Sequence, residues 1–125
     1  MHRRFFIFLG FVALLLRVHA EPPAGLRIAT AGHSFHYWMP SLLMGLVKDA
    51  GITGHQQVAL SAIGGSRTIQ HWDAQGDKQK IKPVLMEGKA DVLTLSPIFL
   101  PDAGIENFVK LGLEHNPKMR ITVQE

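Results

Sequence analysis

Cysteine is absent from this 125-residue sequence. Disulfide bonds, cysteine zinc sites and cysteine nucleophiles are therefore excluded, and a packed core must supply the stability. Charged residues are scarce as well, at 18% of the chain, and the formal net charge is only +3. Arg3, Arg4 and Arg17 account for all of that charge, so the remainder of the chain is neutral. A neutral remainder without a basic patch gives no support for a nucleic-acid partner.

Long hydrophobic runs are also missing. The most extended one covers residues 5–16, whereas a helix that crosses a membrane needs about 20 apolar residues. Arg3 and Arg4 precede this run, and the small-residue stretch Val18-His19-Ala20 follows it. This order predicts a secretory signal peptide over residues 1–20, cleaved after Ala20, and a secreted or periplasmic protein. An uncleaved membrane anchor is the alternative, which we do not expect, because Arg17 and a proline pair follow the run directly.

For the rest of the chain, its length and composition predict a short linker, residues 21–25, and one α/β domain, residues 26–125. Apolar runs of strand length alternate with segments of helical periodicity. The predicted strands are 26–31, 58–63, 90–95 and 119–123, and the predicted helices are 37–50, 78–88 and 105–115. Such alternation favours a parallel sheet with helices on both faces, a three-layer α/β/α fold of flavodoxin-like type.

Two further expectations follow from this pattern. The basic stretch from Lys78 to Lys82 is typical of the solvated face of a helix. The last predicted strand, 119–123, has no covering helix after it, and we therefore expect the domain to be incomplete beyond the fourth strand.

The loops that follow the strands are the places to look for chemistry, because open parallel sheets bind ligands beyond the carboxyl ends of their strands. Ser34 follows the first strand and precedes a helix. The helix N-terminus could stabilise an oxyanion beside this serine, or Ser34 could simply cap the helix. Gly64 and Gly65 follow the second strand, where they form either an oxyanion loop or an ordinary turn. The nucleophile elbow of α/β-hydrolases is excluded, because His36 stands where that motif needs glycine.

Two loop segments carry a family resemblance: Gly32-His33-Ser34-Phe35 after one strand and Ile63-Gly64-Gly65-Ser66-Arg67 after the next, with His71-Trp72-Asp73 behind it. Together they resemble the SGNH (GDSL-type) esterases, in particular an exported bacterial branch. The resemblance covers residues 26–125. It implies Ser34 as the nucleophile and Gly65, or else Gly64, as an oxyanion-hole donor together with the backbone N–H of Ser34. The expected substrate is a carbohydrate or lipid ester, small or polymeric, and no cofactor is implied.

Two blocks of that family are not matched. The third block normally supplies an asparagine, and Leu95-Ser96-Pro97-Ile98 stands in its place. The Asp-x-x-His block that carries the base is missing, since His115 precedes the fourth strand and has Gly112 three positions before it. Serine needs a base to become a nucleophile, so we expect little hydrolysis from this chain, with the base lying beyond Glu125 in a complete version. A noncatalytic binding module on the same scaffold is the alternative.

Histidines and apolar residues near the loops allow further hypotheses. A metal could bind several of the five histidines that lie within residues 26–125, namely His33, His36, His55, His71 and His115. No spacing fixes a third ligand, so we expect no functional metal. The apolar residues Trp38, Trp72 and Ile98-Phe99-Leu100 could line an ester pocket, although core or rim packing is the commoner role for such residues.

Overall fold

A computed structural model of the chain describes residues 20–125. The predicted signal peptide therefore lies outside the described residues, apart from Ala20. None of the helices between residues 20 and 125 has both the length and the apolar character needed to cross a bilayer.

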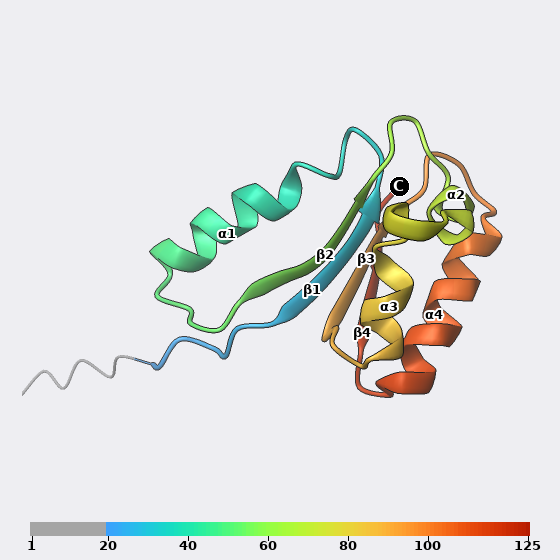
Figure 1. The fold of residues 1–125 in the computed structure, drawn as a ribbon. Coiled ribbons are helices and arrows are strands. Elements are labelled where there is room, and N and C mark those ends of the chain that lie inside the picture. Colours follow the sequence, from blue (N-terminus) through green and yellow to red (C-terminus); the bar gives the residue numbers. More distant parts are fainter. Residues whose placement is uncertain (1–19) are drawn as a thin grey trace, which may run out of the picture.

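A four-stranded parallel sheet forms the centre of the domain (Figure 1). Its strands are β1 (Arg27–Gly32), β2 (Gln56–Ala62), β3 (Val92–Ser96) and β4 (Arg120–Val123), in the order β2-β1-β3-β4. All four predicted strands are present, with ends displaced by one or two residues. The order reverses between β1 and β3, as in flavodoxin-like folds, and such a switch point is where ligands bind in this class.

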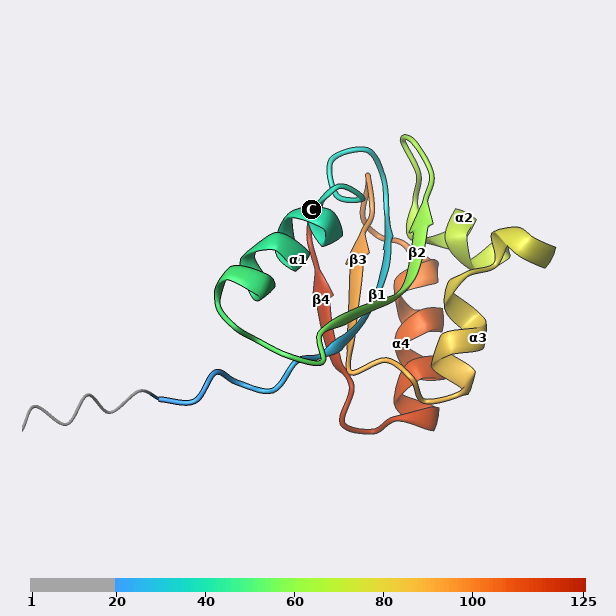
Figure 2. The same cartoon turned by 60° about the vertical axis from the view of Figure 1, so that its left-hand side comes forward.

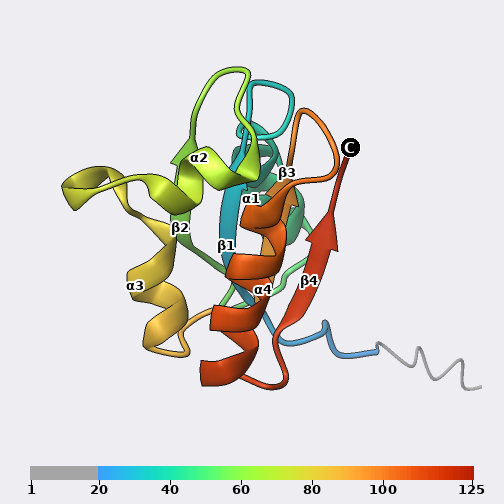
Figure 3. The ribbon, with the colours of Figure 1, turned by 90° about the vertical axis from the view of Figure 1, so that its right-hand side faces the viewer.

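Helices cover both faces of the sheet, so the predicted three-layer α/β fold is confirmed (Figure 2). Helix α1 (Met39–Asp49) lies on one face. Helices α2 (Thr68–Asp73), α3 (Ile81–Met86) and α4 (Ala103–His115) lie on the other. Figure 3 shows these three in front of the strands, with α1 behind them.

The hydrophobic core lies between the sheet and helices α2 to α4. Small side chains on β1, Ala29 and Ala31, let Leu93 and Leu95 of β3 and Phe108 of α4 pack closely, and all five are at most 1% exposed. The face under α1 is more polar and surrounds a cavity of about 170 Å³. Most of the apolar burial that stabilises the fold therefore lies on one side of the sheet.

In the middle of the chain, one helix was missed and the start of another was wrongly predicted. Helix α2 was not predicted, and α3 begins at Ile81 instead of residue 78. The reason is Gln79, whose side-chain oxygen accepts the backbone N–H groups of Ile81 (3.2 Å) and Lys82 (3.1 Å). These contacts cap the first turn of α3 and fix its start. Lys78 belongs to a short 3₁₀ turn (Gly76–Lys78), and only Lys82 of the three lysines lies on the helix.

Candidate functional site

The loops that follow β1, β2 and β3 gather at one edge of the sheet (Figure 1). The last residue of β1, Gly32, pairs with Ala62 of β2 and with Ser96 of β3. Since all three strands run in the same direction, Ser34, Gly65 and the β3–α4 loop start from neighbouring points. We call this region the carboxyl edge, and it is where the candidate site residues lie.

Ser34 is exposed and lies in a hydrogen-bonded turn, not at the start of α1. The N-cap of α1 is Trp38, without a side-chain cap, so the interpretation of Ser34 as the helix cap was wrong, and Ser34 lies four residues before the N-cap. Pro40 gives the reason, because its ring would clash with the carbonyl of His36, four residues earlier, in a regular helix. The N–H groups of His36 (2.9 Å) and Tyr37 (3.1 Å) instead bond to the carbonyl of His33.

The two histidines beside Ser34 turn their rings into the protein. The Nε2 atom of His33 lies 3.2 Å from the Ser96 hydroxyl, and His33 is only 7% exposed. His36 bridges Gln124 (2.9 Å) and Thr94 (3.2 Å), and its ring lies against Gly32, where a Cβ would come within 2.9 Å of it. Burial lowers the pKa of His36. Neither ring is hydrogen-bonded to the Ser34 hydroxyl, so neither acts as its base in this arrangement.

Gly64 and Gly65 form the exposed tip of the β2–α2 loop. Gly65 has a φ of 58°, in the left-handed region that side chains rarely adopt, and both glycines have open space around their Cα atoms. Within residues 20–125, the backbone N–H groups of Ser34, Gly64 and Gly65 make no hydrogen bond to the protein. These amides are therefore available to a ligand at the carboxyl edge.

The sequence did not predict the buried contacts that hold the β2–α2 loop, which carries Gly64 and Gly65. His71 of α2 connects two hydroxyls, with Nδ1 at 2.7 Å from Ser61 Oγ and Nε2 at 2.7 Å from Ser66 Oγ. All three residues are at most 5% exposed. Burial lowers the pKa of His71 to about 4, so its ring is neutral at pH 7. This Ser–His contact resembles a catalytic pair in distance, but its burial keeps substrate away, and its role is to position the loop.

Asp102 is the second missed residue, and it joins the β2–α2 loop to the β3–α4 loop. Its buried carboxylate accepts the N–H groups of Thr68 (2.5 Å) and Ile69 (3.0 Å) at the start of α2, and that of Gly104 (2.9 Å) in α4. Arg67 adds a hydrogen bond to the Pro101 carbonyl. An aspartate directly before a helix is a recognisable N-cap signal, but its reach to a second helix is set by tertiary packing alone.

The remaining predicted residues divide between core and surface. Trp72 packs edge-on against Phe108, with ring centroids 5.1 Å apart, and so belongs to the core. Trp38 is 50% exposed, and the apolar stretch 98–100 of the β3–α4 loop is exposed as well. The His55 ring accepts the Leu26 N–H (3.4 Å). Among the described residues, no three histidine or acidic side chains gather closely enough to hold a metal ion.

Comparisons of the chain with protein-family models, with curated proteins and with solved structures found no match. The resemblance to SGNH esterases accordingly stays a prediction from the residues quoted above. Chemically, the carboxyl edge offers an exposed hydroxyl and free backbone amides from two loops, with no histidine directed at the hydroxyl within residues 20–125.

Proposed function

We propose that the carboxyl edge is the nucleophile and oxyanion-hole part of an SGNH-like ester hydrolase. The observation that carries the proposal is the exposed Ser34 hydroxyl, two residues after β1, beside the loop that offers the free N–H groups of Gly64 and Gly65. These are the groups that acyl transfer through a serine requires, apart from the base.

In the proposed reaction, the Ser34 hydroxyl oxygen attacks the carbonyl carbon of an ester. The carbonyl oxygen becomes an oxyanion, which the N–H groups of Ser34 and Gly65 stabilise. A base takes the hydroxyl proton and passes it to the leaving alcohol, after which water releases the acid from Ser34. His33 and His36 are hydrogen-bonded elsewhere, so neither supplies the base in this arrangement, and we expect the chain by itself to be a weak enzyme.

The surroundings of Ser34 favour an apolar acyl group over a sugar ester. Phe35 is 81% exposed, Trp38 50% and Phe99 65%, and they flank the carboxyl edge from the β1–α1 and β3–α4 loops. Neither segment, residues 33–39 or 97–101, contains a charged side chain. Exposed apolar groups of this kind stabilise a bound hydrocarbon chain by about 25 cal/mol per Å² of apolar surface removed from water.

The test supplies a base from solution. Hydrolysis of p-nitrophenyl acetate and p-nitrophenyl octanoate is measured with and without imidazole, for the native chain, for Ser34→Ala and for the control Ser41→Ala on exposed α1. After subtraction of the hydrolysis that imidazole causes without protein, we expect imidazole to raise turnover and acylation of Ser34, more for octanoate, in the native chain and in Ser41→Ala but not in Ser34→Ala. Imidazole-stimulated rates that are equal in all three proteins would exclude Ser34 as the nucleophile.

A noncatalytic binding module is the second candidate. It is favoured by the inward orientation of the His33 and His36 rings, which leaves the Ser34 hydroxyl without a partner base among the described residues. For a binding module, Ser34→Ala should leave ester binding unchanged while no acyl-serine forms under any condition. Mass spectrometry of the protein after incubation with the octanoyl ester, alongside a calorimetric titration, separates the two functions.

A further inference from the structure

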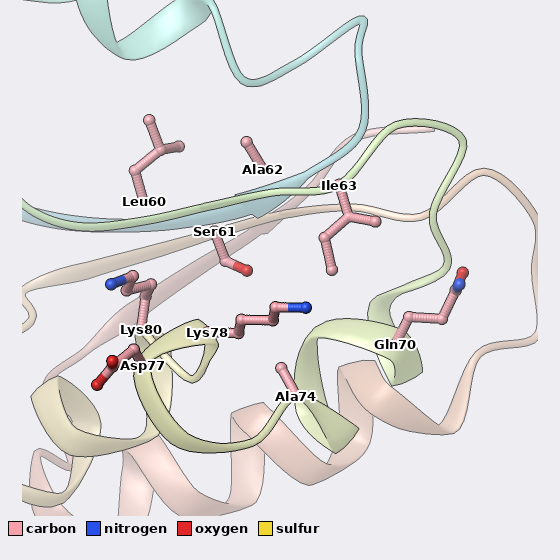
Figure 4. A pocket seen from close by; sticks show the side chains of 9 residues that line it. All are labelled: Leu60, Ser61, Ala62, Ile63, Gln70, Ala74, Asp77, Lys78 and Lys80. Carbon is pink, nitrogen blue, oxygen red and sulfur yellow. The ribbon is translucent and has the colours of Figure 1, made fainter.

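A hollow of about 750 Å³ lies between the outer edge of β2 and the segment that joins α2 to α3 (Figure 4). Four consecutive residues of the strand and its end, 60–63, form one wall. The opposite side includes Ala74 and the side chains of Gln70, Lys78 and Lys80. The hollow has the size of a ligand site but lies along a strand, and Ser34 is not among its lining residues.

The wall of the hollow presents unpaired backbone groups. Within residues 20–125, β2 pairs only with β1. Ile63 donates its N–H to the Gly32 carbonyl (3.3 Å), so its backbone, and by alternation that of Ser61, faces β1. The N–H and C=O groups of Leu60 and Ala62 therefore point away from β1, toward the hollow. Both residues are exposed, which leaves this edge accessible to another strand.

The rim of the hollow carries positive charge. Figure 4 shows the Lys78 side chain crossing the hollow below Ile63, while the Asp77 carboxylate points away from it. Among the described residues, the ion pairs involve Arg27, Arg67 and Lys89, and neither Lys78 nor Lys80 has a carboxylate partner. Lys82, the third lysine of the stretch, is occupied on the ring of Trp72, 3.9 Å from its centroid.

We propose that this hollow binds an extended peptide segment with acidic side chains, which adds to the sheet as a strand beside β2. The backbone groups of Leu60 and Ala62 supply main-chain hydrogen bonds, and Lys78 and Lys80 attract the acidic side chains. A small apolar anion would use the lysines but leave the strand edge unpaired, so the free backbone groups favour a peptide. This proposal does not rest on the chemistry proposed for Ser34.

The probe is a fluorescein-labelled hexapeptide of alternating glutamate and valine, titrated with the chain and followed by fluorescence anisotropy at low salt. We expect saturable binding that weakens as salt is added, together with slower hydrogen exchange at the Leu60 and Ala62 amides. The double variant Lys78→Glu/Lys80→Glu should bind about tenfold more weakly or worse. The matched control Lys118→Glu, on an exposed residue outside the hollow, should bind like the native chain.

Two further reagents test the strand pairing itself. Ala62→Pro removes one outward N–H without touching the hydrogen bonds to β1, an exchange that edge strands tolerate. A hexapeptide N-methylated at alternate residues keeps its charge but cannot complete the pairing. Both changes should weaken binding by about tenfold, and circular dichroism confirms that each variant is folded.

Three results would overturn the proposal. Equal binding of the N-methylated peptide would mean that charge alone holds it. The Leu60 and Ala62 amides could instead be protected from hydrogen exchange at high protein concentration without peptide. If sedimentation then showed a dimer, the edge would be the binding site of a second copy of the chain. Binding of decanoate but not of the hexapeptide would make the hollow a small-molecule site.

Discussion

His71 is a histidine that the fold keeps neutral, because burial disfavours the charged form of its ring, which is 1% exposed. Both ring nitrogens lie 2.7 Å from buried serine hydroxyls. Protonation would place a charge in this buried site, and the negative charge of Asp102 offsets the cost only in part. The contact connects the end of β2 with the loop that carries Gly65. The state of one imidazole is therefore coupled to the geometry of the candidate oxyanion loop.

Acid should destabilise the protein through His71. Its pKa is about 4 in the folded chain and 6.5 in an unpaired histidine. Between these values the unfolded state binds a proton that the folded state does not, so the free energy of unfolding falls as the pH drops from 6.5 to 4. We expect a loss of about 2 to 3 kcal/mol, measured by urea unfolding at several pH values.

The control for this prediction is His115→Gln, at an exposed position. In His71→Gln the pH dependence should shrink to the smaller part that other groups contribute with the same sign. These include His36, whose pKa burial lowers, and Asp91, whose pKa is lowered by hydrogen bonds from Arg27. His115→Gln should keep the native pH dependence. Identical slopes for His71→Gln and the native chain would show that His71 is not the group that titrates.

At the scale of elements, the start of α4 lies against the start of α2, with Asp102 between them. Gly104 permits this approach. A Cβ at Gly104 would lie 2.3 Å from the Ile69 nitrogen and 2.4 Å from the Thr68 carbonyl carbon, both backbone atoms that cannot rotate away. The two helices can share one carboxylate cap only because this position has no side chain.

Gly104→Ala should therefore lower the free energy of unfolding by about 2 to 4 kcal/mol. The matched control is Gly45→Ala in α1, where a Cβ meets nothing within 4 Å. That change should stabilise the chain by up to about 1 kcal/mol, because alanine is the better helix former. Thermal unfolding of the two variants measures both changes in stability. A Gly104→Ala variant as stable as the native chain would contradict the close contact between the two helices.

For the molecule as a whole, stability comes from one core on one side of the sheet. Helix α1 covers a polar face with Thr30, Thr94 and His36, and it leaves Leu42 (52%) and Leu46 (58%) exposed. On the other face, Phe108 is completely buried among the strands and α3. Phenylalanines near the carboxyl edge, such as Phe99, are by contrast exposed.

This difference in burial predicts that replacing phenylalanine by alanine destabilises the fold much more at one position than at the other. Phe108→Ala should destabilise the fold by about 3 to 5 kcal/mol through the cavity it leaves. Phe99→Ala should change the free energy of unfolding by less than about 0.5 kcal/mol. Equilibrium denaturation with a single transition would measure both free-energy changes. Equal destabilisation by the two substitutions would contradict a core confined to the α2–α4 side of the sheet.

The fold could be predicted to a large extent from local patterns, whereas the site could not. Alternating strand and helix signals gave the four strands, the parallel sheet and the helices on both faces, because periodicity and chain connectivity are local properties. Helix α2 escaped notice because its six residues show little periodicity. The start of α3 was misplaced because the side chain of Gln79, not helix propensity, sets it.

By itself the sequence determined the absence of cysteine chemistry, the neutral charge beyond the first residues and the layered α/β fold. It also placed Ser34, Gly64 and Gly65 in loops after neighbouring strands. Only the tertiary structure decided which groups around them are free. It turned the rings of His33 and His36 inward, buried His71 between two serines and left the β2 edge open beside Lys78. Side-chain direction depends on contacts between residues distant in sequence, and no local pattern encodes those contacts.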